Sequence, residues 1–446
     1  MPKVVNISTL STRFDVRFHT GSDAELGETW VLKELKEIIV RDPNCYGFNY
    51  SNIGVPFVRI SDMKQPFLDY SRMVKVSQFI HETFKKTQLK PYDILISVRG
   101  MSTGKVSIFL GEVENANISP NIIIVRLADK SLAAYVAMIL ISEIGQKQIK
   151  RFFSGGGKPS LTAPMINMIR IPKPSASRLG QINKLFETAK NERFLAQNLQ
   201  HEIEEIFSKC FKSFEVKKAV TNKKNLSNLS SRWDAHYHNI GYEKLRYFIE
   251  KYSESKNIND IVAIKESNKE ILEKKIKLGY VEIGSIDNLT GIINSSIIDY
   301  PDNLPDGSKT LLKHGDILIS KVRPYLNAHS IFHAPSNELN YYASKNAFAI
   351  LDSSQYFFKF YILAFLRSHL GISQIVMHQS GTTYPTISDE DVKKIKILFI
   401  PTEYIEIINL DFQKYIEIKQ NEEFTTKTIL DLIQDEIDSF GELLNI

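Results

Sequence analysis

Cysteine is scarce in this chain of 446 residues, which contains two, Cys45 and Cys210. Two cysteines are too few for a disulfide framework or a structural zinc site, so a reducing compartment fits best. No apolar run reaches the ~20 residues that a membrane-spanning helix needs, and the N-terminus lacks the apolar segment of a signal peptide. We therefore expect a cytoplasmic protein with no membrane partner.

Catalytic motifs are lacking as well. Residues 100–105 imitate a phosphate-binding loop, but three residues separate the two glycines where four are required, and Val106 stands where Ser or Thr is needed. His236 and His238 could bind a metal from one strand, yet no third ligand is evident. The Asn/Asp-Pro-Pro-aromatic step of amine methyltransferases is absent. The sequence therefore predicts a non-catalytic chain that holds neither a metal nor a cofactor.

Positive charge is unevenly distributed along the chain. The net charge is +5, but residues 1–175 contain 23 Lys and Arg against 15 Asp and Glu, whereas residues 402–446 contain 3 against 11. The basic residues 1–175 favour binding to a polyanionic partner. The acidic residues 402–446 do not, so this segment is expected to have a different function.

Internal repeats indicate a tandem duplication. Three segments recur in the same order, and their offset drifts only from 219 to 226 residues, which chance rarely produces. The matched segments are 11–19 with 230–238, 90–97 with 313–320, and 159–162 with 385–388.

Each copy is predicted to mix helices and strands, which gives an α+β fold of two homologous domains. Short β-rich runs predict strands at 93–97, 122–125, 316–320 and 394–400. Apolar residues at helical spacing predict helices at 32–39, 132–153 and 357–376.

A long helix is predicted after each copy, following Pro174 and Pro401, with Thr402 as the N-cap of the second. Each has roughly forty residues and would be about 60 Å long. The two helices occupy equivalent places in the repeat and differ in charge sign, so we expect an antiparallel coiled coil and a pseudo-twofold axis. The predicted seam comprises Ile182, Leu185, Leu199, Ile203, Ile206, Ile405, Ile408, Phe412, Ile429 and Ile433. Lys419, Glu422, Thr426 and Glu436 interrupt it.

These patterns divide the chain into four segments. Residues 1–175 form the first globular domain and 176–229 the central helix and linker. Residues 230–401 form the second globular domain and 402–446 the distal helix.

Basic loops that differ between the copies are the predicted polyanion-binding sites. Residues 99–105 follow one matched strand and residues 321–327 follow the other, and each loop offers arginine for bidentate hydrogen bonds to guanine or phosphate. Small, donor-rich turns at 154–158 and 380–384 suit phosphate oxygens. The candidate residues are Arg99, Gly104, Lys105, Lys158, Lys321, Arg323, Tyr325, Asn327, Thr382, Thr383 and Tyr384.

This duplicated pattern resembles the specificity (S) subunits of type I restriction-modification systems. The resemblance rests on the two Asp-Ile-Leu-Ile-Ser strands, the loops after them, the turn at residues 380–388 and the Ile-Pro step before each long helix. It implies that each globular domain is a target-recognition domain that reads half of a bipartite double-stranded DNA site. It also implies two methyltransferase subunits that use S-adenosylmethionine, and an endonuclease and translocase subunit.

Other functions stay open from the sequence alone. The chain could serve a restriction enzyme whose nuclease is fused to its methyltransferase. A stand-alone nuclease or NTPase is disfavoured by the missing motifs, and a coiled-coil scaffold without DNA is disfavoured by the basic first copy.

Overall fold

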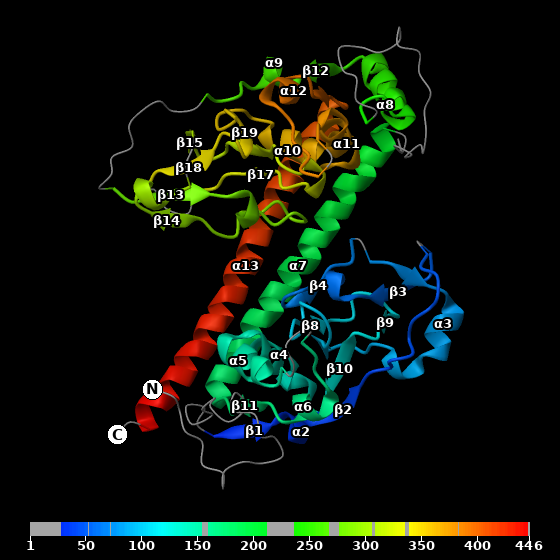
Figure 1. The fold of residues 1–446 in the computed structure, drawn as a ribbon, viewed down its shortest axis with the longest axis vertical. Coiled ribbons are helices and arrows are strands. Elements are labelled where there is room, and N and C mark those ends of the chain that lie inside the picture. The colour runs from blue at the N-terminus through cyan, green and yellow to red at the C-terminus, as the bar shows by residue number, and fades with distance from the viewer. Residues whose placement is uncertain are drawn as a thin grey trace. The chain divides into compact units, whose positions relative to one another are not determined.

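The computed structural model describes residues 28–51, 53–71, 73–153, 159–211, 236–266, 276–305, 308–334, 339–381 and 383–444, with side chains to residue 439. The chain forms two compact units (Figure 1), one of Met1–Lys190 with Phe424–Ile446 and the other of Asn191–Glu423. The first repeated segment at 11–19, Lys158 and Thr382 lie outside the described residues.

The first unit is built on an antiparallel four-stranded sheet in the order β2-β10-β7-β8. These strands span Lys36–Val40, Ile122–Leu127, Asp93–Ser97 and Val106–Phe109. Nearly all side chains of the last three are buried because helices and a smaller sheet cover them, which explains their continuous apolar runs. The smaller sheet contains β6 (Lys75–Val76), β3 (Val55–Val58) and β9 (Asn117–Ile118), and β1 (Thr29–Val31) pairs with β11 (Arg170–Pro172). A further hairpin joins β4 (Met63–Lys64) to β5 (Phe67–Leu68), and the short helices are α2 (Leu32–Leu35), α3 (Gln78–Thr83) and α6 (Ala163–Asn167).

The second unit repeats several of these pairings. A three-stranded sheet holds β17 (Ser330–Ile331), β16 (Ile317–Ser320) and β19 (Phe348–Leu351) in that order. A four-stranded sheet holds β14 (Ile297–Asp299), β13 (Leu278–Val281), β18 (Tyr341–Ser344) and β15 (Lys309–Leu312). The remaining pair is β12 (Ser255–Asn257) with β20 (Lys396–Leu398), and the shorter helices are α8 (Ile240–Lys251), α9 (Ile258–Ile261) and α12 (Asp389–Lys393).

Serine breaks both of the apolar helices that were predicted to run continuously. Residues 132–153 form α4 (Ala133–Ile141) and α5 (Glu143–Arg151), because the Ser142 hydroxyl accepts a hydrogen bond from the Gly145 N–H and so caps a new helix. Ser368 separates α10 (Lys359–Arg367) from α11 (His369–His378) in the same way. No single helix in the described ranges is long and apolar enough to cross a membrane, although α10 and α11, bent by 71°, pass that test together by length and composition.

The helix predicted at residues 32–39 is wrong beyond Leu35. Residues Lys36–Val40 form β2, which pairs with β10. The β-branched residues Ile38, Ile39 and Val40 favour a strand. Pairing with β10 stabilises the strand conformation over the helix.

The predicted pairing of the two long helices is confirmed. Helix α7 spans Ala176–Phe211 and α13 spans Thr402–Leu444. The first unit contains the start of α7 and the end of α13, and the second unit contains the end of α7 and the start of α13, so the helices pair antiparallel within each unit. The expected α+β fold with mixed domains and a helix pair is therefore correct.

Most of the predicted seam is buried. Leu185 and Ile206 are half-buried, while the other eight seam residues are at most 8% exposed: Ile182, Leu199, Ile203, Ile405, Ile408, Phe412, Ile429 and Ile433. Charged residues that interrupt the seam form polar contacts. In the first unit the Ser175 N–H donates to Glu436 at 3.3 Å, and in the second unit Arg193 contacts Glu422 at 3.4 Å.

Equivalent hydrogen bonds support the duplication. In the first unit the Gln148 side chain bonds the backbone N–H and C=O of Arg170, and in the second Gln374 does the same to Lys396. The Lys90 N–H donates to the Asp93 carboxylate at 2.8 Å, and the Lys313 N–H donates to Asp316 at 2.7 Å. Each second-unit residue lies 226 or 223 positions after its counterpart, which matches the sequence offsets.

Candidate nucleic-acid interface

The loop of the first copy begins where β7 ends and closes on itself before β8. The Ser97 N–H donates to the Lys105 carbonyl and the Gly104 N–H donates to the Ser97 carbonyl, both at 2.9 Å. Gly100 and Gly104 have φ values of +85° and +91°, a region that other residues enter only with strain. The loop is therefore a compact turn with Arg99 at its start and Lys105 at its end.

The three described candidates in this loop differ in exposure. Arg99 is exposed, whereas Lys105 is half-buried, and its pKa is lowered first by burial and then by the charge of Lys64. Gly104 is buried, and a Cβ there would lie 2.8 Å from Ile149. Gly104 thus lets the loop pack against α5, and direct contact with DNA stays a prediction for all three residues.

The loop of the second copy begins where β16 ends and contains a short 3-10 turn at Pro324–Leu326. Arg323 and Asn327, on either side of that turn, have φ values of +46° and +61°. Non-glycine residues rarely adopt these values, and such strain concentrates at functional sites. The Tyr325 side chain is 47% exposed between them.

Arg323 lies against the turn that follows α11. Its guanidinium is 5.4 Å from the centroid of the Tyr384 ring, and its backbone N–H donates to the Pro385 carbonyl at 2.8 Å. Tyr384 is 58% exposed and Thr383 is also exposed. Stacking on the ring orients the guanidinium while leaving its edge available for hydrogen bonds. Arg323, Tyr325, Thr383 and Tyr384 thus form one exposed surface.

Two candidates in the second copy make contacts within the chain. The Lys321 ammonium pairs with Asp389 at 2.8 Å. The Asn327 amide nitrogen donates to the carbonyl of Arg367 at 3.2 Å, and its Oδ1 is buried. These side chains hold the loop in place, and their contact with DNA stays a prediction.

Both copies attach this loop to the repeated Pro-Ser/Thr turn through the same backbone pairing. The Leu161 N–H donates to the Val98 carbonyl at 3.1 Å, and the Ile387 N–H donates to the Lys321 carbonyl at 2.9 Å. The adjacent bridges join Arg99 to Ser160 and Val322 to Thr386. In each copy the loop therefore lies beside the repeated Pro-Ser/Thr turn, while the predicted first-copy turn at residues 154–158 lies outside the described residues.

Sequence reasoning missed two arginines beside these loops. Arg367, at the end of α10, donates to the carbonyls of Asn288, Leu289, Asn327 and His329 at 2.6 to 3.1 Å. Arg41 follows β2, and reading residues 36–40 as a strand would have placed it at the sheet edge next to the loop of the first copy. Arg367 had no such signal because its carbonyl partners come from distant segments.

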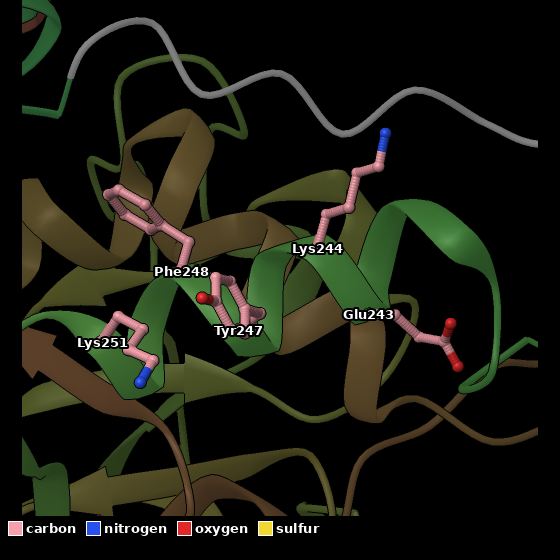
Figure 2. Close-up of a pocket in the computed structure, with 5 residues that line it drawn as sticks. All are labelled: Glu243, Lys244, Tyr247, Phe248 and Lys251. Carbon is pink, nitrogen blue, oxygen red and sulfur yellow. The ribbon is translucent and has the colours of Figure 1, made fainter. Parts of the chain in front are cut away.

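Other potential sites are separate from these loops. The described residues include no group of three or more His, Cys, Asp or Glu that could hold a metal ion. An open pocket along α8 is lined by Glu243, Lys244, Tyr247, Phe248 and Lys251, which Figure 2 shows to come from that one helix. The pocket therefore does not belong to the candidate interface.

Comparison with known families gives this geometry its context. Residues 27–224 match the family model described as type I restriction modification DNA specificity domain. This stretch of the chain is therefore similar to a type I restriction modification DNA specificity domain. The resemblance seen in the sequence is therefore confirmed.

Solved structures with similarity to the chain include the S subunit of a type I restriction-modification system from M. genitalium, at 13% identity and a TM-score of 0.36, covering 94% of this chain and 95% of that one. The HsdS subunit from Thermoanaerobacter tengcongensis matches at 13% identity and a TM-score of 0.29, covering 92% and 96%. A structure of type I restriction-modification complex assembly matches at 14% identity and a TM-score of 0.28, covering 94% and 97%. No curated protein matches the sequence.

The match to the specificity domain covers the first copy and helix α7. Arg99 and the turn beginning at Pro159 lie within the matched residues, so the loop of the first copy is part of the region that resembles a DNA specificity domain. The second copy lies beyond the matched residues, and its likeness to the first rests on the equivalent hydrogen bonds described above.

Proposed function

We propose that this chain is the DNA-recognition subunit of a type I restriction-modification complex and that each copy reads one half of a bipartite DNA site. The shared loop pairing carries the proposal, because Leu161 with Val98 and Ile387 with Lys321 build the same scaffold under two unlike loops. One scaffold with two different loop sequences suits two different half-sites. The cytoplasmic location stays a prediction.

Base reading in the second copy is proposed for the surface around Arg323. Its guanidinium has the fork of donors that matches O6 and N7 of guanine, and the ring of Tyr384 holds it in place. Tyr325 and Thr383 are exposed beside it and offer hydroxyl groups to base edges or sugars. In the first copy, exposed Arg99 is proposed as a DNA-contact residue.

The helix pair is proposed to set the unread gap between the half-sites. Helices of 36 and 43 residues are about 54 and about 65 Å long at 1.5 Å per residue. A rigid helix pair of this length would fix the distance along the DNA between the two half-sites.

Docking of partner subunits is proposed on the outer face of α13. Tyr404, Ile407 and Leu410 are 36 to 55% exposed and three residues apart, so they form an apolar stripe on one face of the helix. We propose that methyltransferase subunits, two per complex, dock on the helices and carry S-adenosylmethionine for adenine N6 methylation. An endonuclease and translocase subunit joins them for restriction.

The test is methylation sequencing of cells that express the partner subunits with and without this chain. The chain is expected to add N6-methyladenine in one bipartite motif. Arg323→Ala is expected to relax one half of that motif by ~1 to 3 kcal/mol and leave the other half unchanged. Identical methylation with and without the chain would refute the proposal, and loss of both halves in the variant would give Arg323 a structural role.

A further inference from the structure

Two arginines from distant parts of the first copy meet at one edge of its main sheet. Strand β10 lies between β2 and β7 and is antiparallel to both. The ends of β2 and β7 and the start of β10 therefore share one edge. Arg41 follows β2 directly, and Arg99 lies two residues after β7.

Backbone contacts fix both arginines beside the segment that enters β10. The Arg41 Nε donates to the carbonyl of Pro120 at 2.5 Å. The Val98 N–H, next to Arg99, donates to the carbonyl of Asn121 at 2.8 Å. Arg99 itself forms a backbone bridge with Ser160 of the repeated turn. These contacts thus hold the Arg41 side chain and the Arg99 backbone at one end of the sheet.

Neither guanidinium has an acidic partner among the residues that the structure describes. The Arg41 Nη2 is covered by the protein and has no hydrogen-bond acceptor. Arg41 contacts Pro120 and the residue before Arg99 contacts Asn121, so the two arginines are held by neighbouring residues; burial and then the charge of Arg99 lower the pKa of Arg41. Arg126 in the same sheet is different, because its charge is paired with Asp93 at 2.6 Å.

A second pair of cations extends this basic surface. Lys64, on the β4–β5 hairpin, is exposed and is the charge that lowers the pKa of Lys105 at the end of the first-copy loop. The Ile108 N–H donates to the carbonyl of Pro66 at 2.8 Å, which holds this hairpin against β8. Two cations of the loop, Arg99 and Lys105, are therefore joined by one from the end of β2 and one from the β4–β5 hairpin.

We propose that Arg41 and Arg99 together bind one phosphodiester group of the DNA at the first half-site, which makes Arg41 an additional DNA-contact residue. This inference rests on the proposed function. Two neighbouring cations without an acid repel each other, and a formal negative charge between them removes the repulsion. A guanine edge has no net charge and would leave both cations uncompensated. The ligand class is thus a phosphate diester, and Arg41 positions the DNA without reading its sequence.

The experiment uses the full chain in complex with its partner methyltransferase subunits and a duplex that carries the methylated motif. Arg41→Gln is expected to weaken binding about tenfold and to reduce the slope of log K against log salt by about one, while the methylated motif stays the same. Lys130→Gln is the matched control, because Lys130 is exposed and lies beyond the opposite end of β10. It is expected to bind like the unchanged complex.

A phosphate scan identifies the bound group. Single neutral methylphosphonates are placed along both strands of the first half-site, and each duplex is tested with the unchanged complex and with Arg41→Gln. One position is expected to weaken the unchanged complex about tenfold and to weaken the variant clearly less, since the Arg41 part of the contact is already lost and only Arg99 remains. Equal losses for both proteins at every position would overturn the inference.

The outcomes separate this inference from the proposed function. If the unchanged complex binds its motif specifically and Arg41→Gln binds equally well, the phosphate site is wrong and the proposed function stands. If Arg41→Gln changes the methylated bases of the first half-site, Arg41 reads a base and the phosphate assignment is wrong. If the unchanged complex shows no sequence preference, the proposed function itself fails.

Discussion

Arg367 and Asn327 hold each other through reciprocal hydrogen bonds. The Arg367 guanidinium donates to the Asn327 carbonyl at 2.9 Å, and the Asn327 amide donates to the Arg367 carbonyl at 3.2 Å. Gly291 makes room for the guanidinium, because a Cβ at this residue would lie 2.7 Å from Arg367 Nη1. Arg367 therefore ties the loop proposed to read DNA in the second copy to α10 and to the turn around Leu289.

Arg367→Ala is expected to relax the second half-site about tenfold or more, because the loop loses the cation that fixes its carbonyls. The first half-site keeps its sequence. Arg367→Lys does not restore specificity, since an ammonium group lacks the planar fork that reaches four carbonyls. Methylation sequencing measures both half-sites. Arg246→Ala is the matched control, because Arg246, on α8, donates to the Tyr237 carbonyl before that helix, and it should preserve both halves.

Asp93→Ala is expected to destabilise the first unit by about 3 to 5 kcal/mol. Asp93 is fully buried, and its carboxylate binds Arg126 through two hydrogen bonds of 2.7 and 2.6 Å, so its removal leaves a buried guanidinium unpaired. Glu143→Ala removes the exposed pair with Lys147 and should leave the urea midpoint unchanged. Similar midpoints for both variants would contradict this role of Asp93.

Ile408→Ala is expected to cost about 2 to 5 kcal/mol, and Leu410→Ala less than about 0.5 kcal/mol. Both residues lie on α13, but Ile408 is fully buried against α7 and α10, whereas Leu410 is 55% exposed. Urea unfolding followed by circular dichroism measures both values. Equal destabilisation by the two variants would mean that the helix pair is not packed through the predicted seam.

The stability of the second unit should fall as the pH drops below about 6.5. His329 is fully buried, its Nδ1 accepts from the Ser320 N–H at 3.1 Å, and burial followed by the charge of Arg367 lowers its pKa to about 3. Between those two pH values the unfolded chain binds a proton that the native state excludes, so native stability decreases by ~1.4 kcal/mol per pH unit, or ~2 kcal/mol at pH 5.

His329→Asn removes this titration and keeps an acceptor near Nδ1. Its unfolding free energy is expected to fall by ~2 kcal/mol less than that of the unchanged chain between pH 7 and 5. His201→Asn, on the exposed face of α7, serves as the control and should follow the unchanged chain. A variant at His329 with an unchanged pH dependence would show that this histidine is not held neutral.

Local patterns predicted those elements whose residues carry their own signal. The runs that became β7 and β16, the proline exits and the heptads of α7 and α13 are visible in the sequence because a buried strand is continuously apolar and a helix seam repeats every seven residues. The segment at 36–40 was misread because its neighbour in the sheet, β10, decided its conformation.

The site was predictable only in part for a similar reason. The repeat aligned the loops with the Pro-Ser/Thr turns, so Arg99, Arg323 and Tyr384 could be named as candidates from the sequence, and their contact with DNA stays a prediction. Arg41 and Arg367 form hydrogen bonds to carbonyls 79 and 40 residues away in the sequence. Composition and local spacing cannot predict contacts between such distant segments. Lys321 has the positive charge expected of a phosphate contact, but its ammonium group forms a salt bridge with Asp389 on α12.

The spacing of the bipartite site tests the central claim most directly. Removal of one facing heptad from both α7 and α13 shortens the helix pair by about 10 Å, which corresponds to about three base pairs of DNA. Single-molecule methylation sequencing is expected to show the same two half-sites with the gap reduced by about three base pairs. An unchanged gap in a folded, active complex would contradict the claim that two copied readers are spaced by this helix pair.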